Sequence, residues 1–299
     1  MKQLLGGVVA RRPRLESTFR YTVEEMNRIR AANDIIARRH GRWFSDGFAA
    51  FKNSDTLFIL GSGPSINELS TEDFEFIAQK DSVGFNYWLV HAFVPRFYVF
   101  QMPAGDRAGF ARLLGDRAPE YRHVPTILRG TELGRDPEGI ARLLREGFGK
   151  DDFFLMNEFP IHSKCAVPID DLITFVENLG LFEFGRVGAY TVKWRGTLGL
   201  IISMGYQLGY RRMVLCGIDM NDDRHFYDEP AYAAARAAYD LPAPGAGNIR
   251  TMMSRRHGPN TVADYVSALS RRMDEVAGVE LLLASRTSPL RDVLPLWRR

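Results

Sequence analysis

The chain alternates short apolar runs with longer amphipathic stretches, and this alternation predicts an α/β fold. Short apolar runs bounded by turn-forming residues are typical of buried strands, whereas apolar residues spaced three or four apart are typical of helices. Strands that alternate with helices form a Rossmann-like, doubly wound, mainly parallel sheet with helices on both faces. The predicted strands are Thr56–Leu60, Ser82–Asn86, Phe97–Gln101, Thr126–Leu128, Phe153–Met156, Met213–Cys216 and Glu280–Leu283. The predicted helices lie near 70–79, 107–114, 137–147, 169–179, 197–208 and 261–276.

The region before the first predicted strand has a different character. Residues 1–21 carry no periodic pattern, whereas Thr22 and Glu25 form a capping-box pattern that predicts a helix from Thr22 to about His40. We therefore expect residues 1–53 to be an N-terminal extension with one helix, and residues 54–299 to be one Rossmann-like domain.

A glycine turn follows the strand at Thr56–Leu60, and it is the most informative local pattern in the chain. The sequence from Gly61 to Ser65 is G-S-G-P-S, and apolar positions beyond Pro64 predict a helix after it. A strand, a glycine turn and a helix start together form an anion site from backbone N–H groups. The dinucleotide motif G-x-G-x-x-G is absent. By spacing alone, nucleotide or phosphate binding and an ordinary strand-to-helix turn are supported about equally.

Other candidate binding residues stand where predicted strands end, because ligands of doubly wound sheets bind beyond the carboxyl ends of the strands. These are Asn86, Gln101 and the run after Cys216, which includes Gly217 and Asp219. Residues 219–256 are rich in Asp, Asn and His and then in Pro and Gly, and we expect them to form a lid over the site. A variable surface loop is the alternative.

His257 precedes a second capping-box pattern, Thr261 with Asp264, which opens an amphipathic helix. The positive end of that helix favours the neutral imidazole, which is the form that a general base needs. The residue types alone leave a surface or structural histidine as the alternative.

Composition narrows the classes of function. The 299 residues are 45% hydrophobic and 25% charged, as in ordinary globular proteins. Cys165 and Cys216 provide neither a metal-ligand spacing nor a disulfide framework, and Cys216 lies in an apolar run typical of a core. No metal site is predicted.

No stretch approaches the ~20 apolar residues of a membrane span, and the start lacks a signal-peptide core, so we expect a cytoplasmic protein. The net charge is only +3, although arginines gather at both ends, at 11–14 and 298–299. They leave open either a solvated surface or peripheral contact with the anionic inner face of the inner membrane. No basic-aromatic repeat indicates nucleic acid.

With these segments placed, the chain resembles the bacterial sialyltransferases that use CMP-sialic acid to decorate lipooligosaccharide. The resemblance implies a Rossmann-like domain of the GT-A-like type with a lid. It also implies a CMP-sugar donor, a glycan or glycolipid acceptor, and inverting transfer without metal or other cofactor. The matching segments are Phe58–Ser65, Val83–Asn86, Thr197–Gly199, Gly209–Asp219, His257–Thr261 and Ser288–Leu290.

The resemblance also implies roles for individual residues. It makes His257 the general base and places donor contacts on the glycine turn, on two strand ends and on the T-L-G helix start. With the rest of the turn and the G-I-D strand end included, the expected donor-binding residues are Gly61, Ser62, Gly63, Pro64, Ser65, Asn86, Gln101, Thr197, Leu198, Gly199, Gly217 and Asp219.

The sequence departs from the family at three positions. Asn221 and His225 stand where the family has two tyrosines that support the leaving phosphate, and Ser62 replaces an asparagine. Asn221 and His225 can still donate hydrogen bonds, so we expect them to retain the task. The donor sugar stays open between sialic acid, Kdo and another nonulosonic acid.

Two rival interpretations remain at this point. The first is a retaining CMP-Kdo transferase with a carboxylate nucleophile, for which Glu158 or Asp219 is available. The second is a non-catalytic nucleotide-binding module in envelope glycan assembly. Whether the chain forms a homo-oligomer is also open.

Overall fold

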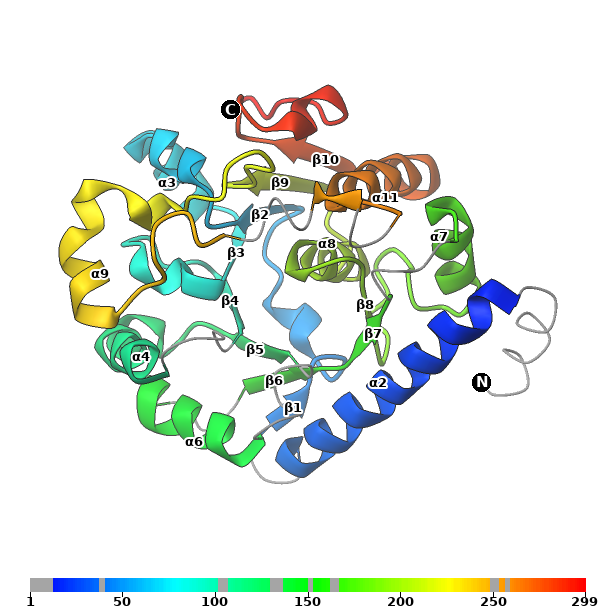
Figure 1. Ribbon diagram of the computed structural model, residues 1–299, viewed down its shortest axis with the longest axis horizontal. Coiled ribbons are helices and arrows are strands. Elements are labelled where there is room, and N and C mark those ends of the chain that lie inside the picture. Colours follow the sequence, from blue (N-terminus) through cyan, green and yellow to red (C-terminus); the bar gives the residue numbers. More distant parts are fainter. Residues whose placement is uncertain are drawn as a thin grey trace.

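A computed structural model of the protein, shown in Figure 1, describes residues 13–37, 41–101, 107–129, 137–149, 153–161, 167–247, 253–255 and 259–299. In these ranges eight strands form one sheet in the order β1-β6-β5-β4-β3-β2-β9-β10, and each neighbouring pair is parallel. The predicted Rossmann-like sheet is therefore confirmed. Its strands are β1 Gly41–Trp43, β2 Thr56–Leu60, β3 Asp81–Phe85, β4 Phe97–Phe100, β5 Thr126–Arg129, β6 Phe153–Met156, β9 Arg212–Cys216 and β10 Glu280–Leu283.

Both faces of the sheet are covered by helices, as Figure 1 shows. In β2, Leu57 and Ile59 face one hydrophobic core while Phe58 and Leu60 face the other, so a continuous apolar run is required. The first core contains residues of α7 (Ile169–Asn178), α8 (Thr197–Gln207) and α11 (Val262–Ala277). The second contains residues of α3 (Thr71–Ala78), α4 (Arg107–Tyr121) and α6 (Pro137–Phe148). Helix α2 (Pro13–Ala37) contacts β1, α6 and the short strand β7 (Glu158–Pro160).

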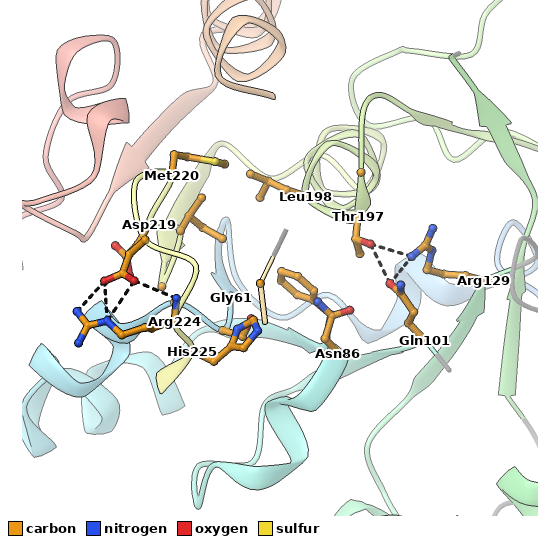
Figure 2. Close-up of a pocket in the computed structure, with 18 of the residues that line it drawn as sticks. Gly61, Asn86, Gln101, Arg129, Thr197, Leu198, Asp219, Met220, Arg224 and His225 are labelled. Carbon is orange, nitrogen blue, oxygen red and sulfur yellow. Dashed lines mark hydrogen bonds and ion pairs between the residues drawn. The ribbon is translucent and has the colours of Figure 1, made fainter. Parts of the chain in front are cut away.

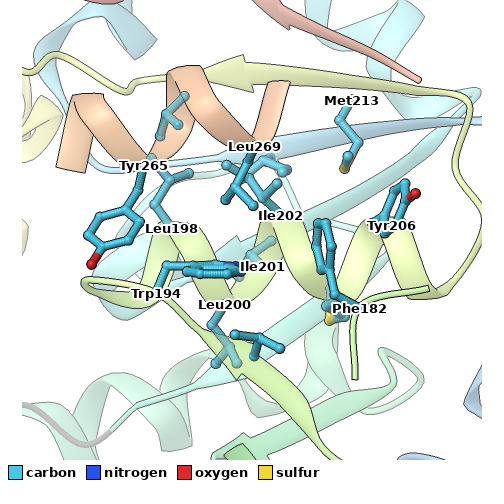
Figure 3. Close-up of a cluster of buried hydrophobic side chains, with 14 of the residues drawn as sticks. Phe182, Trp194, Leu198, Leu200, Ile201, Ile202, Tyr206, Met213, Tyr265 and Leu269 are labelled. Atoms are coloured by element: carbon cyan, nitrogen blue, oxygen red, sulfur yellow. The ribbon is translucent and has the colours of Figure 1, made fainter. Parts of the chain in front are cut away.

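Helix α8 lies between the sheet and α11 and is buried on all sides from Leu198 to Gln207 (Figure 3). The Phe182 and Tyr206 rings stack 4.5 Å apart, and Trp194 donates its indole N–H to the hydroxyl of Ser203 at 2.8 Å. This packing fixes the start of α8, which reaches the carboxyl edge of the sheet.

Two expectations about the N-terminal region need correction. Helix α2 begins at Pro13 rather than at Thr22. Thr22 lies inside the helix, and its hydroxyl donates to the carbonyl of Pro160 at 2.9 Å instead of capping a helix end. In addition, Gly41–Trp43 pair in parallel with β6, so part of the segment expected as an extension belongs to the main sheet.

Strand β1 was not predicted, and neither were β7 and β8 (Thr191–Lys193), which pair with each other in a separate two-stranded sheet. Each has three residues, which is too short for an apolar run to stand out.

The helix expected directly after the glycine turn is also different. A short 3₁₀-helix occupies Pro64–Glu68, and α3 starts only at Thr71, where Ser70 and Asp73 form a capping box. The turn is thus followed by a single tight turn, not by an α-helix whose dipole would point at a ligand.

Two further sequence expectations concern the interior and the membrane. Cys216 is fully buried at the end of β9, as predicted, and burial raises the pKa of its thiol far above the usual value. Of the helices that the structure describes, none combines the length and the apolar character needed to cross a bilayer.

Candidate functional site

A pocket of about 330 Å³ lies along the carboxyl edge of the sheet. The chain passes from β2 to β3 on one side and returns through β9 on the other, so the strand order switches direction between β2 and β9. Doubly wound sheets bind ligands at such a switch point. Ten of the predicted site residues line this one pocket: Gly61, Ser62, Gly63, Asn86, Gln101, Thr197, Leu198, Gly217, Asp219 and His225.

The carboxylate of Asp219 joins three strand ends at the floor of the pocket. Its Oδ2 accepts the backbone N–H of Ser65, beyond β2, at 2.8 Å, and its Oδ1 accepts the hydroxyl of Ser285, beyond β10, at 2.7 Å. Asp219 itself follows β9 and is 5% exposed. Both oxygens therefore have a structural task.

The amides of the glycine turn are mostly used within the protein. Gly61 and Gly63 donate their N–H groups to the carbonyls of Cys216 and Gly217, at 2.8 and 2.9 Å. Pro64 has no N–H, and Ser65 donates to Asp219. The turn was expected to bind an anion through several backbone N–H groups. Among the described residues, the N–H of Ser62 is the one in this turn that has no hydrogen-bond partner.

The two glycines of the turn are needed for close packing rather than for an unusual backbone. Gly63 has φ −70°, which other residues adopt easily. However, a Cβ at Gly63 would lie 2.4 Å from Oδ2 of Asp219, and one at Gly61 would lie 2.5 Å from the carbonyl oxygen of Gly217. The two glycines are therefore needed because the residues after β9 pack closely against the turn after β2.

Asn86 adopts a left-handed backbone, with φ 55°, directly after β3. Asparagine tolerates this conformation better than most residues, and such conformations concentrate at functional sites. The hydroxyl of Tyr98 donates to the carbonyl of Asn86 at 2.6 Å and so holds the bend in place. The side chain of Asn86 lines the pocket.

The wall opposite the sheet edge comes from the segment predicted as a lid. Arg224 and His225 both line the pocket, and Arg224 makes an ion pair with Asp222 at 2.7 Å (Figure 2). Asp228 holds the segment around Arg224 and His225 in place. Its carboxylate accepts hydrogen bonds from the Arg236 side chain and from the backbone N–H groups of His225 and Gly245.

His225 is held in a defined orientation. Its ring stacks on the buried Tyr227 with centroids 4.8 Å apart. Burial lowers the pKa of His225 below its ordinary value, and the nearby Asp228 opposes this shift. A neutral imidazole has one N–H group and one lone pair, and protonation gives it a second N–H group that can donate to a phosphate.

The other end of the pocket is a charged cluster below the start of α8 (Figure 2). Arg129 is the last residue of β5, and its Nε lies 3.2 Å from Oε1 of Glu158 in β7. Its Nη1 donates to Oε1 of Gln101 at 2.5 Å and to the hydroxyl of Thr197 at 2.8 Å. Lys193, at the end of β8, reaches Oε2 of Glu158 at 3.3 Å.

Four predicted site residues do not line the pocket: Pro64, Ser65, Gly199 and Asn221. Ser65 acts through its bond to Asp219, and a Cβ at Gly199 would lie 2.8 Å from Cβ of Trp194, which indicates a packing role. Asn221 points elsewhere, because its amide donates to the carbonyl of Thr287 at 3.3 Å.

His257, the predicted base, lies outside the described residues. The segments on either side of it are placed, however. Arg195 donates to the carbonyls of Ser254 and Asn260, and Arg195 stands two residues before the pocket residue Thr197.

Three residues that line the pocket were not predicted as site residues: Arg129, Lys193 and Arg224. Arg129 and Lys193 each end a strand. Asn86 and Gln101 were selected because they stand at the ends of predicted strands, and the same reasoning would have selected Arg129. Lys193 was hidden because β8 was not predicted, and Arg224 because it stands among the acidic residues of the lid. In the described part of the chain, no three His, Cys, Asp or Glu side chains are arranged to hold a metal ion.

Comparison with known proteins gives a limited result. No family model matches the sequence, and no curated protein is significantly similar to it. Among solved structures, the α-2,3-sialyltransferase Cst-I of Campylobacter jejuni superimposes with TM-score 0.43 at 16% identity, covering 82% of this chain and 81% of that one. The sialyltransferase CstII of the same organism, in complex with cytidine-5′-monophosphate, gives TM-score 0.40 at 14% identity, covering 81% and 84%. A likeness this low does not by itself assign an activity.

Proposed function

We propose that the protein is a glycosyltransferase that moves a nonulosonic acid, such as sialic acid, from a CMP-sugar to a glycan hydroxyl. The observation that carries the proposal is the convergence of motifs on one pocket. The G-S-G-P-S turn, Asn86, the T-L-G start of α8 and the G-I-D end of β9 are far apart in sequence, yet all reach the pocket at the switch point. These are the segments on which the sequence resembles the CMP-dependent family.

The proposed reaction is a single displacement. The acceptor hydroxyl attacks the anomeric carbon, the bond from that carbon to the phosphate oxygen breaks, and CMP leaves with the bonding electrons. The proton of the hydroxyl passes to a base, for which we propose His257. A positioned base contributes roughly 10²–10⁴-fold to such a step.

The leaving phosphate gains negative charge, so cationic groups near it lower the barrier. We assign this role to Arg224, with His225 joining when it is protonated. Both line the pocket beside Ser62, whereas Asn221, the earlier candidate, is bonded to Thr287 instead.

The pocket favours this scheme over a retaining one. A double displacement needs a carboxylate with an oxygen available to attack. Asp219 engages both oxygens with Ser65 and Ser285, and Glu158 is fully buried between Arg129 and Lys193. Neither is placed as a nucleophile.

The test is CMP release from CMP-Neu5Ac, CMP-Kdo and CMP-pseudaminic acid in the presence of glycan acceptors. We expect release with at least one donor, an inverted product, and unchanged rates in EDTA. His257→Ala should lower kcat at least about 100-fold, whereas His123→Ala, an exposed histidine, should leave kcat unchanged. Absence of turnover and of CMP binding would refute the proposal, and loss of activity in EDTA would refute the metal-free step.

A further inference from the structure

The hydroxyl of Tyr98 is a buried polar group that the proposed reaction does not use. Tyr98 lies in β4, is fully buried and does not line the pocket. Its ring packs edge-on against Tyr121 and Phe148, with centroids 5.7 and 5.9 Å away. Burial raises the pKa of Tyr98 well above its usual value, so the hydroxyl stays protonated and can donate. A phenylalanine would fill the same space without the cost of burying a polar group, so the hydroxyl needs an explanation of its own.

That hydroxyl donates to the carbonyl of Asn86 at 2.6 Å, and Asn86 has a strained backbone. With φ 55° it is, together with Asp240, one of two described residues other than glycine that have a positive φ. Such a conformation costs free energy and persists where the surrounding structure holds it. The bond joins β4 to the bend that follows β3, and the side chain of Asn86 lines the pocket. The contact that holds the bend therefore also sets the direction in which this side chain enters the pocket.

The bend also connects the edge of the sheet with the lid. Tyr87 follows Asn86, and its ring meets the ring of Tyr227 edge-on, with 5.8 Å between the centroids. Tyr227 is buried and stacks on His225, which lines the pocket from the lid side (Figure 2). Neither Tyr87 nor Tyr227 lines the pocket itself. A continuous series of contacts thus runs from Tyr98 through the bend to His225, so a shift of the backbone at Asn86 reaches both walls of the pocket.

We infer that Tyr98 is a positioning residue of the ligand site: its hydroxyl holds the bend at Asn86 and thereby places the Asn86 side chain and the lid residue His225. The inference rests on the proposed function, since it takes this pocket as the site of the CMP-sugar. Without the hydroxyl, Asn86 can leave the left-handed region, and the fraction of molecules whose pocket is ready to bind falls. The apparent affinity falls by the same factor, because the ligand binds to the competent fraction. The hydroxyl therefore acts before the ligand arrives, by pre-organising the site.

The experiment compares two substitutions that each remove one buried hydroxyl and keep the ring. Tyr98→Phe removes the donor to Asn86, whereas Tyr121→Phe, the matched control, removes the hydroxyl of the ring that packs against Tyr98. Calorimetric titration measures the affinity for CMP and for the non-transferring 3-fluoro analogue of CMP-Neu5Ac. We expect Tyr98→Phe to bind both ligands about tenfold more weakly than wild type, and Tyr121→Phe to bind them within about twofold of wild type. Equal affinities for Tyr98→Phe and Tyr121→Phe would overturn the inference and make the hydroxyl a feature of the core alone.

A second comparison tests whether the effect passes through the bend. Glycine adopts the left-handed conformation without strain and has no side chain to place, so in the Asn86→Gly background the hydroxyl loses its task. We expect Tyr98→Phe to weaken CMP binding by less than about twofold in that background. If it weakens binding there as much as it does with Asn86 present, Tyr98 acts by another route and the inference fails.

The lid provides a readout that needs no ligand. Burial lowers the pKa of His225, so a displaced lid should bring this pKa closer to its ordinary value of 6.5. An NMR titration of the histidine ring protons, with His225 identified by the signal missing from His225→Gln, should show the rise in Tyr98→Phe and not in Tyr121→Phe. An unmoved pKa of His225 in Tyr98→Phe would overturn the inference for the lid. If wild type binds neither CMP nor the analogue, the proposed function fails, and this titration still decides whether Tyr98 positions the pocket.

Discussion

Asp219 accepts the backbone N–H of Ser65 at 2.8 Å, although the two residues lie 154 positions apart. This bond joins the end of β9 to the glycine turn after β2, and the second oxygen of Asp219 extends the link to Ser285 beyond β10. The floor of the pocket is therefore a joint between three strand ends. These two hydrogen bonds explain why the charged residue Asp219 is buried at this point of the sheet.

The joint predicts a specific effect for Asp219→Asn. The amide keeps the shape of the carboxylate, but it has one acceptor oxygen instead of two. Ser65 and Ser285 each donate to a different oxygen of Asp219, so one of these two buried donors loses its partner. We expect a loss of about 1–3 kcal/mol in the free energy of unfolding, measured by urea denaturation. The matched control is Asp292→Asn, because that carboxylate is 79% exposed and should change stability by less than about 0.5 kcal/mol. Equal midpoints for both variants would contradict the structural role of Asp219.

Gly63→Ala tests the close approach at the same joint. The added methyl would lie 2.4 Å from Oδ2 of Asp219 and 2.8 Å from the carbonyl oxygen of Gly217, so backbone must shift. We expect a loss of about 1–3 kcal/mol in the free energy of unfolding together with weaker CMP binding. In contrast, Gly115→Ala in α4 meets no atom within 4 Å and should stabilise the protein by up to ~1 kcal/mol. A harmless Gly63→Ala would show that the turn has room that the structure does not indicate.

Asp219 and Gly63 also show what the sequence could and could not predict. The apolar runs located seven strands of the main sheet, and the rule about strand ends found Asn86 and Gln101, because both signals are local. The reason for the glycines was missed, since it lies in a contact with residues that follow β9, about 155 positions further along the chain. Likewise, Glu158 interrupts the apolar pattern of β7 because its charge is balanced by Arg129 and Lys193, which come from two other strands.

His91 makes stability depend on pH. Its ring stacks on Trp88 at 4.7 Å, its Nδ1 accepts the N–H of Phe93 at 3.0 Å, and burial, with a smaller effect from the charge of Arg117, lowers its pKa from 6.5 to about 4. The unfolded chain therefore takes up this proton first as the pH falls. The stabilisation is complete above pH 6.5 and is lost progressively down to pH 4, by up to roughly 3 kcal/mol.

The check for His91 is the difference in unfolding free energy between wild type and His91→Asn, which cannot titrate. That difference should shrink as the pH is lowered from about 7 to about 4.5. A constant difference for His91→Asn would show that His91 does not lose its stabilisation on acidification.

His225 predicts a pH dependence of ligand binding rather than of stability. Its pKa is lowered, mainly by burial, so the ring is uncharged near neutral pH. The phosphodiester of a CMP-sugar keeps its charge in this range and favours the imidazolium. Affinity for the 3-fluoro donor analogue should therefore rise as the pH falls below about 6.5, and His225→Gln should remove this rise. Parallel pH profiles for wild type and His225→Gln would exclude a contact with the phosphate.

Arg195 provides a test of the proposed base that does not alter the base itself. It donates to the carbonyls of Ser254, at 3.3 Å, and of Asn260, so it holds both ends of the segment that carries His257 next to the start of α8. Arg195→Met should leave a folded protein that binds CMP normally but positions the base poorly, and kcat should fall by roughly 10–100-fold. In the His257→Ala background the same change should add little, because residues that act as a unit are not additive. If Arg195→Met instead lowers kcat equally in both backgrounds, Arg195 acts on the pocket by another route and the link to His257 is wrong.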